Sequence, residues 1–197
     1  MNPLTSIKGS LITGLIIAVV IALCIAPAQF NVLGLARWLH IISGVTWIGL
    51  LYYFNVVQTP ALSIAAADKG GPGGAGVSKY VAPLALLWFR WSAVATWLTG
   101  LWYLGDSKHL PGALALGGFK DLYELTIGIG AWLGTIMLFN VWVFIWPNQK
   151  KILGIVPATD EEKAKARKVA LMASRTNFVL SIPMLMCMAS ASHGLPF

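Results

Sequence analysis

Five long apolar stretches, separated by shorter polar segments, constrain the fold of this chain more than any other feature. They lie at about residues 10–29, 33–57, 80–104, 122–146 and 168–192. A helix that crosses a bilayer needs about 20 predominantly apolar residues, and each stretch is about that long. A single segment in lipid satisfies its backbone hydrogen bonds internally only as a helix. We therefore predict an all-α integral membrane protein, a helical bundle with about five transmembrane helices.

The composition supports this prediction. Of the 197 residues, 57% are hydrophobic and 11% are charged, and the mean hydropathy is +0.74. An average soluble domain carries roughly 25% charged residues. The loops are too short to form a soluble domain with its own active site. We expect a single transmembrane helical domain over residues 1–197.

The basic residues are concentrated on one side of the predicted bundle, and the chain carries a net charge of +7. The amino terminus and the second and fourth loops share that side, with Lys8, Lys69, Lys79, Lys150, Lys151, Lys163, Lys165, Arg167 and Lys168. Loops rich in Lys and Arg stay in the cytoplasm. We predict a multi-pass protein of the bacterial inner (cytoplasmic) membrane, with its amino terminus in the cytoplasm and its carboxyl terminus outside. These charges favour contact with membrane lipid, and we expect no nucleic acid partner.

The last helix is predicted to begin before it enters lipid. Thr159 and Glu162 have the spacing of a capping box, in which each side chain bonds the other residue's backbone N–H. The lysines that follow would lie against anionic headgroups.

The second apolar stretch carries ionisable residues, which are costly inside a membrane and mark functional sites. At helical spacing Arg37, His40, Gly44 and Trp47 fall on one face. This face therefore combines a charge, a metal ligand, a gap and an aromatic wall. We expect any chemistry of this chain to lie there.

Two of the three histidines are candidates for holding haem iron. On the predicted topology His40, His109 and His193 all belong to the outer half, and His40 and His193 lie at depths that suit a bis-histidine site. Neutral imidazoles ligate iron without bringing a charge into the membrane. Gly44, one turn from His40, would leave room for a flat ring. The alternative is structural, with His40 bonded to a backbone carbonyl and His193 resting at the membrane interface.

Arg90 is the second unusual residue, since it lies near the middle of the third stretch with no acidic residue at its depth. A buried guanidinium needs acceptors. Asn55, Asn140 or freed carbonyls would serve, as would a carboxylate of a bound cofactor or substrate. Arg37 has a simpler explanation, because Glu124 begins the fourth stretch on the same side.

Several segments resemble the membrane domain of the bacterial membrane-bound urate oxidase (urate hydroxylase) family. They cover most of the second to fifth stretches: Trp38 to Asn55 with Gln58-Thr-Pro60, Trp91 to Gly100, Asn140-Val-Trp142 with Trp146-Pro147, Ser174 to Asn177, and Ser181-Ile-Pro183-Met184 to Ser192-His193. In the full-length family this all-helical domain is joined to a carboxyl-terminal c-type cytochrome domain that would take electrons. The present sequence has no CxxCH motif, so we expect no fused acceptor, and a separate c-type cytochrome in its place.

Three functions remain open. The first is a cofactor-free accessory or structural subunit of a larger membrane redox complex, docked to other membrane protein subunits through Gly130 and Gly134 and through tryptophans of the third stretch. The second is a urate oxidase-like redox protein that binds haem b or another metal and passes electrons to an external cytochrome. Its site residues would be His40 and His193 as ligands, with Arg37, Arg90 and Trp47 around the cofactor. The third is a transporter or channel.

Overall fold

The computed structural model describes residues 2–26 and 30–196, and within these residues it is helical without any strand. Five of its helices are long and apolar enough to cross a membrane. Their bounds are Ile7–Ile25, Val32–Ala67, Val77–Asp106, Leu122–Ile152 and Asp160–Ser190. The all-helical prediction with five candidate spans is therefore confirmed. Residues 27–29, the expected end of the first stretch, lie outside the described residues.

The long helices contain short breaks in their hydrogen-bond pattern. In chain order the elements are η1 (Pro3–Thr5), α1 (Ile7–Ile25), α2 (Val32–Tyr52), η2 (Tyr53–Gln58), α3 (Thr59–Ala67), η3 (Val77–Val81), α4 (Ala82–Asp106), α5 (Leu110–Leu114), η4 (Leu116–Phe119), α6 (Leu122–Phe139), η5 (Asn140–Ile145), α7 (Trp146–Ile152) and α8 (Asp160–Ser190). The segments η2, η3 and η5 are π-helical, with one extra residue in the turn, whereas η1 and η4 are 3₁₀ helices.

The chain divides into two compact units, residues 1–32 and 33–197. The first unit holds α1, which begins where the Ser6 side chain accepts a hydrogen bond from the backbone N–H of Gly9 at 3.0 Å. This contact is an N-cap, which satisfies one of the free donors of the first turn. No residue of α1 is buried.

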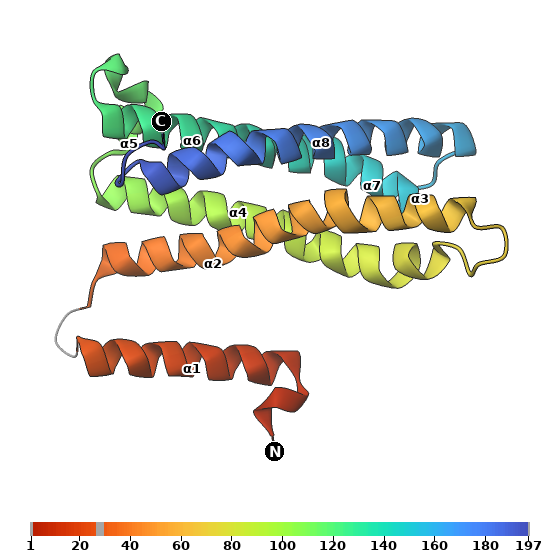
Figure 1. Ribbon diagram of the computed structural model, residues 1–197, viewed down its shortest axis with the longest axis horizontal. Helices are drawn as coiled ribbons and strands as arrows, with labels where there is room; N and C mark the ends of the chain where they lie inside the picture. Colours follow the sequence, from red (N-terminus) through yellow and green to blue (C-terminus); the bar gives the residue numbers. More distant parts are fainter. Residues whose placement is uncertain (1, 27–29, 197) are drawn as a thin grey trace. The chain divides into compact units, whose positions relative to one another are not determined.

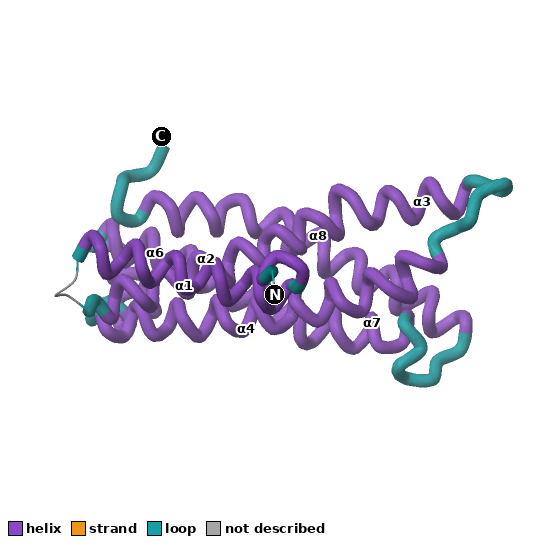
Figure 2. The backbone as a smooth tube through the Cα atoms, turned by 90° about the horizontal axis from the view of Figure 1, so that it is seen from below, coloured by secondary structure: helices purple, strands orange, loops and turns teal. Residues whose placement is uncertain are grey.

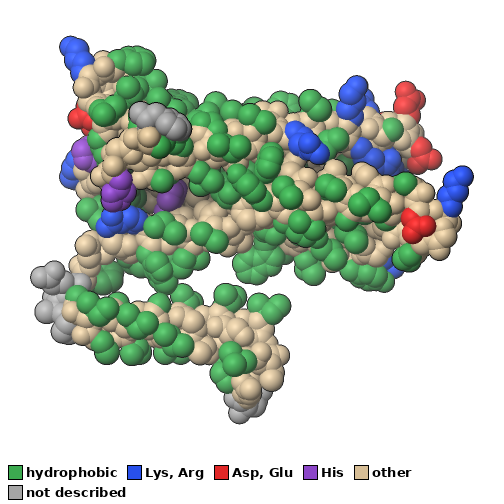
Figure 3. All heavy atoms as spheres, viewed as in Figure 1, with side chains coloured by type: hydrophobic (Ala, Val, Ile, Leu, Met, Phe, Trp, Pro, Cys, Tyr) green, Lys and Arg blue, Asp and Glu red, His purple; other side chains and the backbone are tan. Residues whose placement is uncertain are grey.

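The second unit is a bundle whose long helices run between two ends (Figures 1 and 2). One end holds α5 and the chain that follows α8, and we call it the histidine end. The other holds the connections from α3 to η3 and from α7 to α8, residues 68–76 and 153–159, and we call it the lysine end. On the face shown in Figure 3, charged side chains gather at both ends, and the length between them is mostly apolar.

All four long helices of this unit contribute to one apolar core. Its buried members are Trp47, Leu51, Leu86, Phe89, Ala93, Met137, Val141, Ile145 and Met184. At the histidine end a smaller cluster joins α5 to α4 and α6, with Leu104, Ala113 and Ile127 as its buried members. Met188, near the end of α8, and Ala191, directly after it, pack against this second cluster. The carboxyl end of α8 therefore lies with α5 and the start of α6.

At the lysine end the helices run further than hydropathy predicts. The second and fourth stretches were expected to end at residues 57 and 146, but the helices continue to Ala67 and Ile152. The last helix begins at Asp160, before its apolar part, and both bonds of the predicted capping box are present. Thr159 Oγ1 accepts from the Glu162 N–H at 3.2 Å, and Glu162 Oε2 accepts from the Thr159 N–H at 2.8 Å. Hydropathy finds the lipid-embedded part of a helix, whereas caps set where the helix ends.

Candidate functional site

Three polar side chains form a seam along α8, and each points at another helix. Ser174, Asn177 and Ser181 recur at spacings of three and four residues, which places them on one face. Ser174 accepts a hydrogen bond from Asn55 in η2 at 2.9 Å. Ser181 lies 3.4 Å from the hydroxyl of Tyr52 and donates to its own helix at Phe178 O, at 2.7 Å. The seam therefore ties α8 to the end of α2 and to η2.

Asn177 is the centre of this seam and is completely buried. Its Oδ1 accepts from Asn140 Nδ2 at 2.8 Å, and its own Nδ2 donates to the carbonyl of Met137 at 2.9 Å. Asn140 is the first residue of η5, so the π-helical turn and the asparagine pair occupy the same level. Asn140 therefore donates its hydrogen bond to Asn177, whereas the sequence suggested that Asn140 accepts one from Arg90.

His40 faces α4 with one ring nitrogen bonded. Its Nδ1 lies 2.8 Å from the carbonyl oxygen of Thr96. Because that oxygen only accepts, Nδ1 carries the proton and Nε2 keeps its lone pair. Metal-bound histidines are held in the same way by a second hydrogen bond to a carbonyl. His40 therefore fits the role of a haem ligand and equally fits the structural alternative of a carbonyl bond.

The space around His40 is set by glycines of two helices. A Cβ added to Gly100 of α4 would lie 3.0 Å from Cε1 of the His40 ring, so the ring packs directly on this glycine. A Cβ added to Gly44 would lie 3.7 Å from Cγ2 of Thr96. This is an ordinary van der Waals distance, so a methyl group would fit beside Gly44.

Arg37, one turn before His40, lies over an aromatic ring rather than beside a carboxylate. Its Cζ atom is 5.8 Å from the centroid of the Tyr103 ring. The expected ion pair with Glu124 is not formed in the described structure, because Glu124 takes another partner. A guanidinium is attracted to the face of an aromatic ring. Arg37 is exposed, so this contact does not require its charge to be buried.

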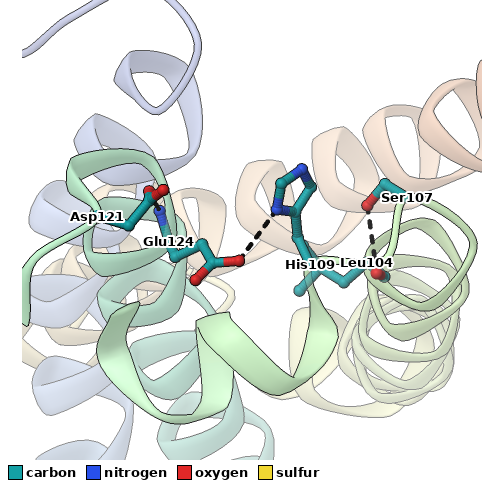
Figure 4. A network of polar contacts seen from close by, with 5 residues as sticks. All are labelled: Leu104, Ser107, His109, Asp121 and Glu124. Carbon is teal, nitrogen blue, oxygen red and sulfur yellow. Dashed lines mark hydrogen bonds and ion pairs between the residues drawn. The ribbon is translucent and has the colours of Figure 1, made fainter. Parts of the chain in front are cut away.

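Glu124 pairs with His109 at the histidine end (Figure 4). His109 Nδ1 lies 3.1 Å from Glu124 Oε1, and the rings of His109 and Tyr123 meet edge to face at 4.7 Å. Asp121 caps α6 by accepting from the Glu124 N–H at 2.8 Å. Gly112 of α5 packs against the Glu124 carboxylate so closely that a Cβ would overlap it. A short helix, one side-chain cap and an ion pair thus close this end of the bundle.

Arg90 turns away from the His40 region. Its Cζ atom lies 3.9 Å from the centroid of the Trp146 ring, and Lys150 approaches the same ring at 6.0 Å. The guanidinium therefore rests on an aromatic face near the lysine end, where an oxygen acceptor was expected. Asn55 bonds to Leu51 O and Ser174 instead.

The remaining candidates lie in different surroundings. Trp47 belongs to the central core with 2% of its surface exposed, and its Nε1 has no hydrogen-bond partner there. His193 lies in the turn after α8 and is exposed. No described contact joins His193 to His40. No cluster of three or more His, Cys, Asp or Glu occurs in the part of the chain that the structure describes. The roles of His40, His193, Arg37, Arg90 and Trp47 around a cofactor stay predictions.

Sequence reasoning did not single out the seam of α8. The signal was present, since three small polar residues recur at helical spacing within an apolar stretch. Their partners carried no such signal, because Asn55 and Asn140 lie more than thirty residues away from the seam in sequence.

Comparison with known proteins agrees with the resemblance read from the sequence. Residues 124–197 match the family model described as urate oxidase N-terminal. The matched part contains nearly all of α6, with η5, α7 and α8, and so includes the asparagine pair. Neither a curated protein nor a solved structure matches the chain. The matched residues are less than half of the chain, and over them the chain is similar to the urate oxidase N-terminal family.

Proposed function

We propose that this urate oxidase-like chain is an accessory or structural subunit of a larger membrane redox complex. In this complex a separate c-type cytochrome takes the electrons. The chain would lie in the bacterial inner membrane with its lysine end in the cytoplasm, because basic loops stay on that side. The polar groups of the seam would then hold the helices of the subunit together.

One observation carries this proposal: tryptophans are exposed in the middle of a span. Trp88 and Trp91 each leave 55% of their surface exposed. They lie near the centre of the helix Val77–Asp106. Tryptophans that face lipid favour the two interfaces of a membrane, not its middle. A partner helix that covers Trp88 and Trp91 would explain their position.

The partner is expected to use this tryptophan face more than the small residues of α6. Gly130 already packs inside the chain, since a Cβ there would lie 3.2 Å from Cβ of Cys187 in α8. Gly134 has no atom within 4 Å of an added Cβ, but it is buried. The tryptophans of α4 are the larger exposed surface.

The test is purification of the tagged chain from its native membranes in mild detergent, with particle mass and composition as readouts. We expect a particle heavier than one protomer that contains a cytochrome, and loss of the partner from a Trp88→Ala/Trp91→Ala variant. Trp102→Ala is the matched control, because Trp102 lies at the end of α4 and bonds to Asp106. A stable lone protomer from native membranes would refute the proposal. So would sustained urate consumption by the isolated chain with oxygen as the only acceptor.

A second function, haem binding, is favoured by the bond between His40 and Thr96, which leaves Nε2 as a ligand. Haem b would supply one-electron transfer, and His40 would orient it. Replacement of His40 by Ala should then abolish the Soret band of dithionite-reduced membranes. His109→Ala is the control, because His109 is paired with Glu124. A parent protein without a Soret band would exclude this function.

A further inference from the structure

A cavity opens at the lysine end of the second unit, and we call it the shaft. Its volume is about 570 Å³, and all four long helices of the unit contribute to its walls. Along α8 it is lined from Arg167 to Ser174, a distance of roughly 10 Å at the rise of an α-helix. The shaft therefore runs from the lysine end to the level of the seam.

The inner part of the shaft is uncharged. Among the described residues that line it, Arg167 is the only one with a charged side chain, and Arg167 is exposed. A charge that enters an apolar site without a partner loses its hydration, whereas a neutral group loses much less. The helices around the shaft are long and apolar enough to cross a membrane. We therefore expect a ligand of the shaft to be neutral and soluble in lipid.

Gln58 brings to the shaft an acceptor that no donor of the chain reaches. Gln58 lines the shaft, and its Oε1 atom is buried without a hydrogen-bond partner in the described structure. Buried polar atoms are normally bonded, so this exception asks for an explanation. A ligand completes the bond only if it carries an O–H or N–H group. The ligand is therefore expected to donate a hydrogen bond.

Ser174 has the opposite capacity at the inner end of the shaft. Asn55 Nδ2 donates to Ser174 Oγ at 2.9 Å. The same nitrogen donates to the carbonyl of Leu51 at 2.9 Å, and this bond fixes which end of the amide is nitrogen. Ser174 Oγ is thus the acceptor in its bond with Asn55, and the hydroxyl proton of Ser174 remains available to a ligand. A ligand that serves both Gln58 and Ser174 must donate and accept, as hydroxyl groups do.

The walls near these polar groups are apolar and partly aromatic. Phe54 and Phe89 line the shaft, and their rings meet edge to face at 5.4 Å. Leu86 and Ile145 add aliphatic surface. Aromatic side chains pack well against another ring, with its face or with its edge. The walls therefore favour an aromatic ligand.

We propose that the shaft binds a quinol, which is a neutral, lipid-soluble aromatic ring with two hydroxyl groups on opposite carbons. One hydroxyl donates to Gln58 Oε1, the other accepts from Ser174, and the ring packs against Phe54 and Phe89. The oxidised form, a quinone, has carbonyls in place of the hydroxyls, so it cannot donate and leaves Gln58 Oε1 unpaired. The inference goes beyond the proposed function, which places no small molecule in this chain.

Three probes of similar size separate these bonds. Tetramethylhydroquinone donates and accepts, tetramethylbenzoquinone only accepts, and tetramethylbenzene does neither. Binding to the purified full chain in detergent is measured by equilibrium dialysis without oxygen, and micelles without protein give the background. Since an unpaired buried acceptor changes affinity by about tenfold, we expect the hydroquinone to bind at least about tenfold more tightly than the quinone. Tetramethylbenzene should bind most weakly.

Variants then assign each bond to a side chain. Gln58→Leu should abolish the preference for the hydroquinone over the quinone. Asn148→Leu is the matched control, because it also replaces a carboxamide by leucine, while Asn148 bonds to Phe144 O and does not line the shaft. Ser174→Ala should weaken the hydroquinone and the quinone alike, and it tests the site independently if Gln58→Leu does not fold. Arg167→Gln should leave all three affinities unchanged, because the ligand is neutral.

Equal affinity for the hydroquinone and the quinone, or no hydroquinone binding above the micelle background, would overturn the proposal. A preference that Gln58→Leu and Asn148→Leu reduce alike would also overturn it. So would loss of binding in Arg167→Gln, which would indicate an anionic ligand. These outcomes are independent of the proposed function, because partner retention is read from the Trp88→Ala/Trp91→Ala variant. The shaft can fail its test while the complex is recovered, and the reverse.

Discussion

The two ends of the bundle use their polar residues in opposite ways. At the histidine end, Glu124 pairs with His109, and the guanidinium of Arg37 rests on Tyr103. At the lysine end, Gln58 and the exposed Arg167 line a cavity, and the Oε1 atom of Gln58 is buried without a partner in the described structure. A group that is already bonded is available to a ligand only after its bond is broken. The comparison therefore separates side chains that hold the fold together from side chains that remain free to bind.

This difference adds a criterion that the sequence alone does not supply. An arginine or histidine in an apolar stretch is rare, and rarity suggested function. The structure adds a second criterion, which is whether the group has a partner. By that criterion Gln58, an ordinary residue in sequence, is a stronger binding candidate than His109.

The largest effect is expected at the seam, next to the inner end of the shaft. Asn177→Leu leaves the Asn140 amide and the Met137 carbonyl without the bonds that Asn177 provides. We expect a loss of about 1–3 kcal/mol, because a buried polar group is left unpaired. In a chain of this size that loss lowers the melting temperature by about 2–4 °C per kcal/mol.

The double variant Asn140→Leu/Asn177→Leu is the control for this prediction. It removes both amides, so it should be more stable than the single variant. Thermal unfolding in one detergent, followed by circular dichroism, measures both. If the single variant melted with the parent protein, the seam would not hold the bundle together.

The next effect is expected in the packing of the histidine end. A Cβ added to Gly128 of α6 would overlap the backbone carbonyl of Ala113 in α5, and backbone cannot rotate away. We expect Gly128→Ala to destabilise the chain by about 1–3 kcal/mol through overpacking. Gly134→Ala on the same helix meets nothing within 4 Å and should be neutral or slightly stabilising. Equal melting temperatures for the two variants would contradict a tightly packed histidine end.

At the lysine end the expected change has the opposite sign. Gln58→Leu removes a buried oxygen that has no partner, so the empty protein should become more stable by up to about 1 kcal/mol. Destabilisation comparable with that of Asn177→Leu would mean that Gln58 has a structural bond, and the contrast between the two ends would disappear.

The smallest effect is expected for the ion pair of the histidine end. The His109 side chain is 42% exposed and that of Glu124 is 23% exposed. Exposed pairs contribute less than about 1 kcal/mol and are weakened by salt. Glu124→Gln should therefore change the melting temperature by a degree or two at most, and less at high ionic strength. A large loss of stability would show that this carboxylate has a role beyond the pair.

Much of the fold follows from the sequence, since the bilayer imposes length and hydropathy on every spanning helix. The capping box at Thr159 and Glu162 is also local, and it was correctly predicted. The π-helical segments were not, because the hydropathy of α2 to α3 and of α6 to α7 runs through them without a break. The end at Ile152 was missed because residues 148–151 are too polar for a hydropathy window, whereas α3 was missed because the second stretch was already long enough to span a membrane.

The candidate sites were predictable only in part. The placement of Arg37 and His40 on one helix face requires only helical periodicity. The contact between Arg90 and Trp146 joins residues fifty-six positions apart, and nothing in either neighbourhood marks the other. The cavity at the lysine end is lined by all four long helices of the second unit, and in the sequence Arg167 looks like one more residue of a solvated basic face. Contacts between residues far apart in the sequence, rather than local patterns, decide which polar groups have no partner.

The π-helical turn η5 sets the angular relation between the seam and the lysine end. Asn140 begins the turn and Gln149 lies beyond it, so the extra residue of the turn sets the angular phase between the seam and the shaft. Each residue of an α-helix advances the direction of its side chain by about 100°. If η5 became α-helical without the loss of a residue, Gln149 would turn by about 100° relative to Asn140, although no side chain had changed. The direction of Gln149 is therefore determined by the helix type of η5 as much as by the position of Gln149 in the sequence.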